Sequence, residues 1–135
     1  QVHDEWELNR REASALLQRE GELLETVQLV GADALAETEQ VILQVGRMLR
    51  EDFLQQSAFG PDAYCPPAKQ YWMLKVILHH FYLLDGAVRR GVHLDRALNP
   101  DIMADIARMR DWPAERAEDE AYALMERADQ AFLAL

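Results

Sequence analysis

The stretch of sequence that determines the fold spans residues 25–65 and reads ETVQLVGADALAETEQVILQVGRMLREDFLQQSAFGPDAYC. Its first residues end a helical pattern at Gly31, and glycine commonly stops a helix because it adopts the left-handed backbone conformation without strain. A second helical pattern follows a short turn and runs to Gln56. Two long helices joined by so short a turn pack antiparallel, so the stretch predicts a helical hairpin over residues 5–56.

Each helix of the predicted hairpin carries apolar residues in steps of three and four, the spacing that places them on one helical face. The first helix is expected over residues 5–30, with a stripe of Ala13, Leu16, Leu17, Leu23, Leu24, Val27 and Val30. The second is expected over residues 36–56, with a stripe of Val41, Ile42, Val45, Met48, Leu49 and Phe53. Both stripes predict faces that are buried in a common core.

Three further helices are expected after the loop SAFGPDAYCPP at residues 57–67, whose Gly-Pro and Pro-Pro pairs break any helix. They cover residues 67–91, 99–110 and 114–134. Asn99 followed by Pro100 is typical of a helix start, because asparagine caps the helix and proline fits its first turn. The sequence therefore predicts an all-α bundle of about five helices that forms a single domain over residues 1–135.

Composition excludes several classes of function. Half of the residues are hydrophobic and 28% are charged, which is typical of a globular chain. The net charge of −10 argues against nucleic acid and anionic membrane surfaces as partners, since both require clustered Lys and Arg. No apolar run approaches the roughly 20 residues that span a bilayer. The single cysteine, Cys65, forms no internal disulfide, so we expect a cytoplasmic protein without direct membrane insertion.

Residue motifs for catalysis are absent from the sequence. It contains no glycine-rich phosphate loop and no nucleophile elbow. His79 and His80 are adjacent, so on a helix they point about 100° apart and do not chelate one ion together. We interpret them as a partly buried polar pair beside the core. The missing E-x-x-H motif disfavours a ferritin-like di-iron enzyme, and the acids Glu37, Glu39, Glu51 and Asp52 are interpreted as a solvated face.

The loop at residues 57–67 carries two aromatic side chains, Phe59 and Tyr64, between glycine and proline residues. They either cap the core of the bundle or stack on a flat ligand such as a nucleobase. Residue chemistry alone thus describes an acidic helical module with no active site of its own.

Several short motifs in residues 25–65 carry a family resemblance: VQLVG at 27–31, DAL at 33–35, REDFLQQ at 50–56, AF at 58–59 and YC at 64–65. In this order they resemble the C-terminal helical domain of the catalytic A subunit of V-type and archaeal-type rotary ATPases. KQY at 69–71 and MLK at 73–75 match the third helix of that family. Ser57 and Ala63 stand where the family has Asn and Thr, in a loop that is one residue shorter.

The resemblance implies a place in a larger machine. The full subunit has an N-terminal β-barrel and a nucleotide-binding domain with the phosphate loop, both upstream of this domain in the same chain. Three A and three B subunits alternate in a ring around a central rotor, and ATP or ADP with Mg²⁺ binds between them. The parent complex is an H⁺-transporting ATP synthase or ATPase, peripheral to the membrane. The fragment alone is expected to hold no cofactor and to be inactive.

The resemblance also implies roles for individual residues. Phe59 matches the family position that lines the adenine pocket, and Tyr64 is its expected partner there. Asp33, Glu37 and Glu39 take the place of an acidic loop that touches the rotor in the related F-type catalytic subunit. No catalytic residue and no metal ligand are expected in this domain.

Two other readings of the same sequence stay open at this point. The C-terminal domain of the non-catalytic B subunit has the same architecture, although the F-L-Q-Q and Tyr-Cys motifs favour A. A free-standing helical adaptor would need an exposed apolar groove for a partner helix, and the predicted stripes all pack against one another.

Overall fold

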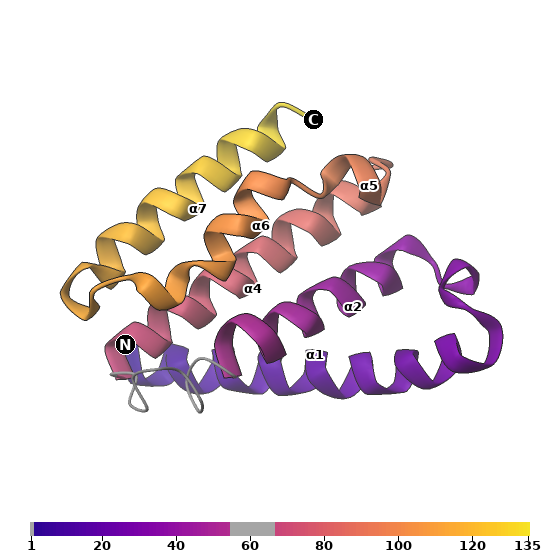
Figure 1. Cartoon of the computed structure of the whole chain (residues 1–135), viewed down its shortest axis with the longest axis horizontal. Helices are drawn as coiled ribbons and strands as arrows, with labels where there is room; N and C mark the ends of the chain where they lie inside the picture. Colours follow the sequence, from indigo (N-terminus) through magenta and orange to yellow (C-terminus); the bar gives the residue numbers. More distant parts are fainter. Residues whose placement is uncertain (1, 55–66) are drawn as a thin grey trace.

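The computed structural model describes residues 2–54 and 67–135, and these form an all-α bundle, which confirms the predicted fold class (Figure 1). The described residues contain six α-helices and no strand. Their bounds are α1 Val2–Val30, α2 Glu37–Met48, α4 Pro67–Arg89, α5 Leu94–Ala97, α6 Pro100–Ala107 and α7 Ala117–Leu133. The single-turn helix α5 was not predicted, because a stretch of four residues is too short to show a helical period.

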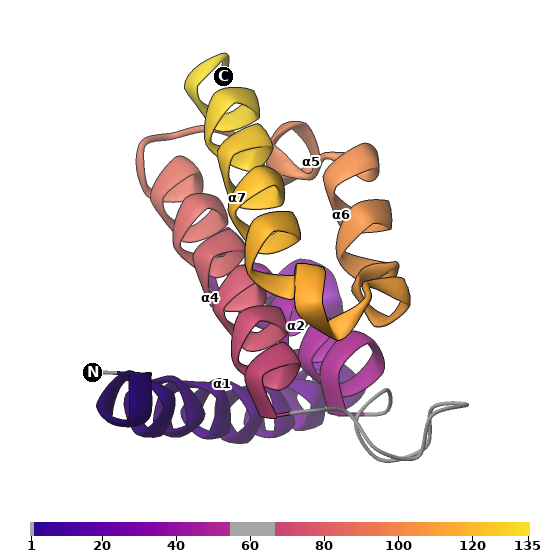
Figure 2. The same cartoon turned by 90° about the vertical axis from the view of Figure 1, so that its left-hand side faces the viewer.

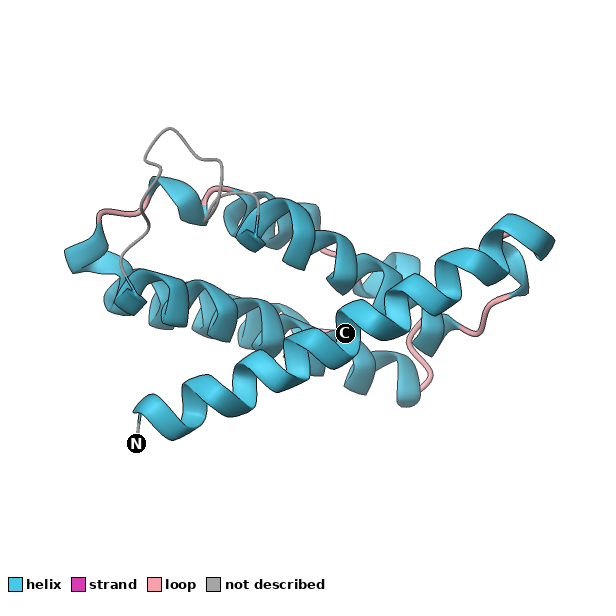
Figure 3. Cartoon of the chain, turned by 90° about the horizontal axis from the view of Figure 1, so that it is seen from below, coloured by secondary structure: helices cyan, strands magenta, loops and turns pink. Residues whose placement is uncertain are grey.

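The hairpin of α1 and α2 is present as predicted. Gly31 ends α1 with a φ of 88°, and its N–H donates to the Val27 carbonyl at 2.8 Å. A positive φ is a backbone conformation that glycine adopts without strain, as expected of the residue that ends the helix. In Figure 1 the hairpin forms one edge of the molecule, and Figure 3 shows α1 crossing obliquely beneath the other helices.

The second helix of the hairpin changes its winding before the aromatic loop. The α-helical part ends at Met48, and a π-helix covers Leu49–Leu54. Leu49 and Phe53 lie in this segment and are both buried. The predicted second helix is therefore present as far as Leu54, with π winding over residues 49–54, which residue spacing does not separate from α winding. Gln55 and Gln56 lie outside the described residues.

The apolar stripe of α1 was only partly correct. Ala13, Leu16 and Leu23 are buried as predicted, but Leu24 is 41% exposed and Val30 is 63% exposed. Leu24 lies about 100° around the helix from Leu23 and so faces away from the bundle. Val30 belongs to the last turn of α1, which reaches beyond the elements that could cover it.

Helix α4 forms the centre of the core: it lies between α7 and α2 in Figure 1, and Figure 2 shows its lower end above α1. Nine of its residues are buried: Tyr71, Met73, Leu74, Val76, Ile77, Leu78, His80, Leu84 and Ala87. They lie on nearly all sides of the helix rather than on the single stripe that was predicted, and Phe81 and Val88 of that stripe are only partly buried. A helix that is apolar all round belongs in the interior, and each large side chain buried there stabilises the fold by about 1.5–3 kcal/mol.

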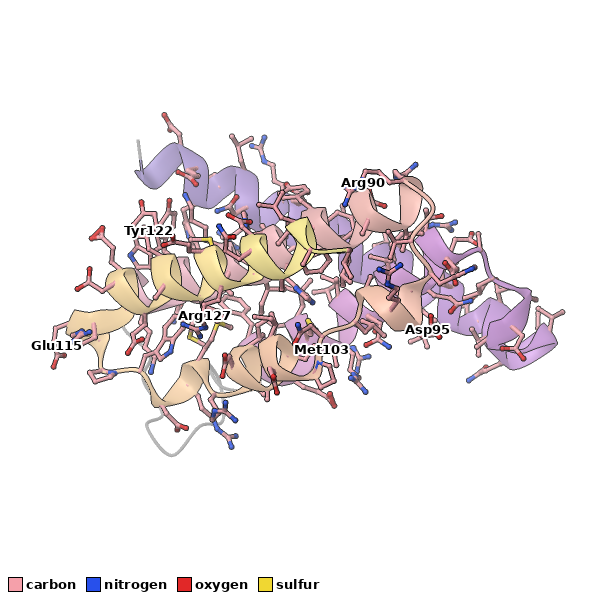
Figure 4. The ribbon with its side chains drawn as sticks, turned by 90° about the horizontal axis from the view of Figure 1, so that it is seen from above. Arg90, Asp95, Met103, Glu115, Tyr122 and Arg127 are labelled. Atoms are coloured by element: carbon pink, nitrogen blue, oxygen red, sulfur yellow. The ribbon has the colours of Figure 1, made fainter. Side chains whose placement is uncertain are left out.

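Local hydrogen bonds fix the start of α6 and join this helix to α7. Asn99 caps α6 as predicted, because its Oδ1 accepts from the N–H groups of Asp101 and Ile102 at 3.0 and 3.1 Å. Asp105 on α6 accepts from Arg127 on α7 at 3.0 Å. Figure 4 shows Arg127 on the side of α7 that faces α6, and Tyr122 on the opposite side.

The start of α1 is tied to α4 by one ion pair. Lys75 Nζ lies 2.6 Å from Glu5 Oε1 and 5.6 Å from the ring centres of both Tyr71 and Trp72. The hydrogen bond from Lys75 lowers the pKa of Glu5, and the same bond raises the pKa of Lys75. Within the described residues, no helix has the length and apolar character needed to cross a membrane.

Candidate functional site

The hairpin tip, residues 31–39, is the first candidate site. A 3₁₀ turn at Ala32–Ala34 follows Gly31, and Leu35 then turns inward and is 7% exposed. The Leu35 carbonyl accepts from Gln40 Nε2 at 3.1 Å, which fixes the return of the chain into α2. Figure 1 shows this tip reaching past α5 at one end of the molecule, so it is open to a partner on that side.

The three predicted rotor-contact acids all lie in the hairpin tip, but their surroundings differ. Asp33 is exposed, and no hydrogen bond or ion pair to it is found within the described part of the chain. Glu37 Oε1 accepts from the N–H of Leu94 at 3.2 Å. Glu39 accepts from the N–H of Ala36 at 3.0 Å and from Arg19 Nη2 at 3.1 Å. Two of the three acids are therefore used inside the domain.

A second polar contact joins the two hairpin helices further from the tip. Glu20 on α1 is only 3% exposed, and its two carboxylate oxygens accept from Arg50 Nε at 3.1 Å and Arg50 Nη2 at 2.5 Å. This bond raises the pKa of the Arg50 guanidinium. Gly46 on α2 lies against the same carboxylate, and a Cβ placed on it would lie 2.6 Å from Glu20 Cδ. The glycine thus makes room for a buried carboxylate whose arginine partner is half exposed.

Sequence reasoning missed this contact, although the sequence contains two signals for it. Glu20 falls between Leu16 and Leu23 in steps of four and three, so it occupies the buried face of α1. Gly46 lies inside a helical pattern, where glycine costs about 1 kcal/mol relative to alanine unless a close approach requires it. An acid on a buried stripe and a glycine inside the facing helix together indicate such a pair.

The predicted adenine-pocket residues, Phe59 and Tyr64, lie outside the described residues. The structure describes what flanks them: the π-helix Leu49–Leu54 before the loop and Pro67 at the start of α4 after it. Near the end of that π-helix, burial raises the pKa of Asp52, and the charge of Glu51 raises it further.

The two adjacent histidines of α4 differ in their surroundings. His79 Nε2 lies 2.6 Å from Asp129 Oδ1 on α7 and is partly exposed. His80 is 1% exposed, packs its ring edge-on to Phe132, and neither ring nitrogen has a hydrogen-bond partner within the described part of the chain. Burial lowers the pKa of His80 to about 4, with a smaller contribution from His79. The interpretation of a partly buried pair therefore holds for His79 but is wrong for His80, which is fully buried.

Comparison with known protein families agrees with this architecture. Residues 1–97 match the family model described as the C-terminal domain of V and A type ATP synthase. The matched region contains the whole hairpin, the loop that follows it, and helices α4 and α5. The chain therefore belongs to the family of C-terminal domains of V- and A-type ATP synthases.

Individual relatives specify which subunit of the synthase the domain resembles. The chain is 50% identical over 133 residues to the A subunit of the A-type ATP synthase of Methanopyrus kandleri, a match that covers 98% of this chain and 22% of that protein. It is 45% identical over 132 residues to the A subunit of Thermococcus kodakarensis, covering 97% of this chain and 22% of that protein. The same-named protein of Pyrococcus horikoshii is 42% identical over 132 residues, covering 97% of this chain and 13% of that protein. These relatives assign the domain to the A subunit rather than to the B subunit.

The chain spans about a fifth or less of the length of these relatives. The parts of the A subunit that lie outside it are therefore not described by this structure. Within the described residues, no group of three or more His, Cys, Asp or Glu side chains is arranged to hold a metal ion.

Proposed function

We propose that the chain acts as the C-terminal domain of the catalytic A subunit in an H⁺-transporting rotary ATP synthase or ATPase. The observation that carries the proposal is the match of almost the whole chain to the A subunit of A-type ATP synthases. In this assignment three A and three B subunits form a ring around the rotor, and the ring lies at the cytoplasmic face of a membrane. ATP or ADP with Mg²⁺ binds in the upstream nucleotide-binding domain of the same chain.

The residues of the described structure do not fit a Mg²⁺-nucleotide site of their own. The sequence has no phosphate loop, and the described residues offer no set of metal ligands. We therefore expect the isolated chain to be inactive and assign it two supporting roles in the intact subunit: force transmission through the hairpin and contact with the adenine base.

The hairpin is proposed as the lever that joins nucleotide-driven domain closure to the rotor. Its tip carries three acids at the end of the molecule, which suits a partner with basic residues. Packed helices move as rigid bodies because protein interiors are dense and resist compression. A movement at the base of α1 and α2 is therefore expected to reach the tip.

The lever is tested by neutralising the tip acids together, as Asp33→Asn, Glu37→Gln and Glu39→Gln, in the intact rotary assembly. We expect reduced torque and poorer coupling between ATP hydrolysis and rotation. Torque and coupling equal to those of the unmodified assembly would show that the acids form only a solvated turn.

The aromatic loop is proposed to supply Phe59, with Tyr64 as its partner, to the adenine pocket. Base stacking on an aromatic ring contributes about 1–3 kcal/mol in nucleic-acid complexes. Phe59→Ala is therefore expected to weaken nucleotide binding by about 5- to 150-fold, since about 1.4 kcal/mol corresponds to a factor of ten. Unchanged nucleotide affinity in an intact A–B assembly carrying this substitution would contradict the assignment.

A further inference from the structure

Two of the three acids at the hairpin tip make contacts inside the domain that join the tip to other helices. We propose that Glu37 and Glu39 are internal braces that hold the tip at a fixed angle, and that Asp33 alone of the three is free to meet a partner. This inference rests on the proposed lever function and deepens it, because it assigns different roles to acids that the sequence presents as equivalent.

Glu39 joins the two helices of the hairpin. One carboxylate oxygen accepts from the N–H of Ala36, which caps the start of α2, and the other accepts from Arg19 on α1. Arg19 and Glu39 are 20 residues apart in the sequence, so their contact closes the hairpin from one side. Arg19 also lies 3.3 Å from Glu22, but that pair stays within α1. Of the two contacts that Arg19 makes, only the bond to Glu39 joins α1 to α2.

Glu37 joins the hairpin to a different part of the bundle. Its Oε1 accepts from the backbone N–H of Leu94, the first residue of α5, and its Oε2 lies 3.7 Å from His93 Nδ1. His93 makes no side-chain capping bond to α5, so Glu37 supplies that acceptor from 57 residues away in the sequence. Helix α5 is packed against α4. Through this contact the start of α2 is held to the core.

The two contacts restrain the tip from different sides. Glu39 ties it to α1, and Glu37 ties it through α5 to α4. Glu39 uses both of its carboxylate oxygens within the domain and Glu37 uses one, so a basic partner would have to compete with bonds already made. Asp33 lies in the 3₁₀ turn between them, is exposed, and has no such bond among the described residues. A lever transmits force only if its angle to the bundle is fixed, and these contacts fix it.

The Glu39 brace is tested in the intact rotary assembly that contains the complete A subunit. Arg19→Gln and Glu39→Gln are compared singly and together, because glutamine at position 39 keeps an oxygen for the N–H of Ala36. Each single change is expected to speed amide exchange over residues 36–40 by about threefold, the effect of losing one partly exposed ion pair. Each should also lower the torque sustained under load while unloaded ATP hydrolysis stays unchanged. The double variant should be no worse than either single one.

Glu22→Gln is the matched control, because it removes the other partner of Arg19 without unlinking the helices. It should leave amide exchange over residues 36–40 and torque unchanged. If Arg19→Gln keeps full torque while Glu39→Gln loses it, Glu39 contacts the rotor directly and the brace is overturned.

The Glu37 brace has a direct reporter in the amide of Leu94. Glu37→Ala should increase hydrogen exchange at this amide in the intact assembly, and Asp33→Asn should leave it unchanged. Equal exchange of the Leu94 amide with and without the Glu37 carboxylate would overturn this brace. Amide exchange thus tests whether Glu37 and Glu39 restrain the hairpin tip, and torque tests whether the hairpin transmits force to the rotor. Faster exchange with unaltered torque in every variant would support the restraint of the tip and contradict the proposed lever function.

Discussion

The helices of the α1–α2 hairpin are antiparallel and those of the α4–α7 pair are parallel in Figure 1, and different forces hold the two pairs together. Helices α4 and α7 both bury apolar side chains such as Leu74, Ile77 and Leu124 in the common core. The hairpin has an apolar contact as well, but it adds the half-buried Glu20–Arg50 pair, the Arg19–Glu39 bond and the close approach at Gly46. Apolar burial is strong and non-directional, whereas hydrogen bonds and ion pairs fix geometry. The comparison indicates that the α4–α7 pair sets stability and the hairpin contacts set shape.

The largest expected effect lies in the α4–α7 half. Ile77 on α4 is fully buried, so Ile77→Ala should lower the free energy of unfolding by about 3–4 kcal/mol, through lost burial and the cavity that remains. Urea unfolding of the chain measures this. Leu133→Ala on α7 is the matched control, because Leu133 is 78% exposed and its loss should cost under about 0.5 kcal/mol. Similar losses for both would remove the basis for calling α4 the stabilising core.

Low pH should also lower the stability of the fold, through the buried side chain of His80 on α4. Burial lowers its pKa from 6.5 to about 4, so between these values the unfolded chain takes up a proton that the folded chain does not. Stability is therefore full above about pH 6.5 and falls as the pH drops toward 4, by about 3 kcal/mol in total. The His80→Leu variant should lack this loss of stability when the free energy of unfolding is measured in urea at pH 7, 6 and 5.

The Leu133→Ala variant keeps His80 and should show the same pH dependence as the unmodified chain. A His80→Leu variant with an unmodified pH slope would assign the acid sensitivity to other groups.

The hairpin responds in a different way, through the fit between Gly46 and Glu20. Gly46→Ala should cost about 1–2 kcal/mol, because overpacking at 2.6 Å from Glu20 Cδ outweighs the helix propensity gained. With Glu20→Ala in place the contacts to Cδ and Cγ are gone and only the contact to Cβ at 2.9 Å remains, so the same change should cost less. Gly21→Ala is the control within α1, where no atom lies within 4 Å of the added Cβ; it should stabilise by up to about 1 kcal/mol. A loss at Gly46 of the same size with and without the Glu20 carboxylate would show that the approach of the carboxylate is not the cause.

The same contrast explains which features the sequence could predict. Helix starts and stops follow from local chemistry, so Gly31 and the Asn99 cap were recognised directly. The stripe residues Val41, Val45 and Leu124 were also correct, since periodicity reports burial. The partners of Glu37 and Glu39 could not be predicted, because Leu94 and Arg19 are brought to them only by the packing of distant helices. The π-helix depends on packing in the same way.

A change in salt concentration should produce the smallest effect, and it should distinguish the α1–α2 hairpin from the α4–α7 pair most directly. The Arg19–Glu39 pair is partly exposed, and such pairs contribute about 0.2–1 kcal/mol and are screened by ions. Raising the salt concentration to about 1 M, where the Debye length falls to about 3 Å, should therefore speed amide exchange at the start of α2 by about two- to threefold. Amides of α4 should be unaffected, since apolar burial is not screened. Hydrogen exchange of the chain, compared before and after the salt concentration is raised to about 1 M, measures this. An equal response in α2 and α4 would mean that ion pairs do not distinguish the hairpin, and its geometry would then follow from apolar packing alone.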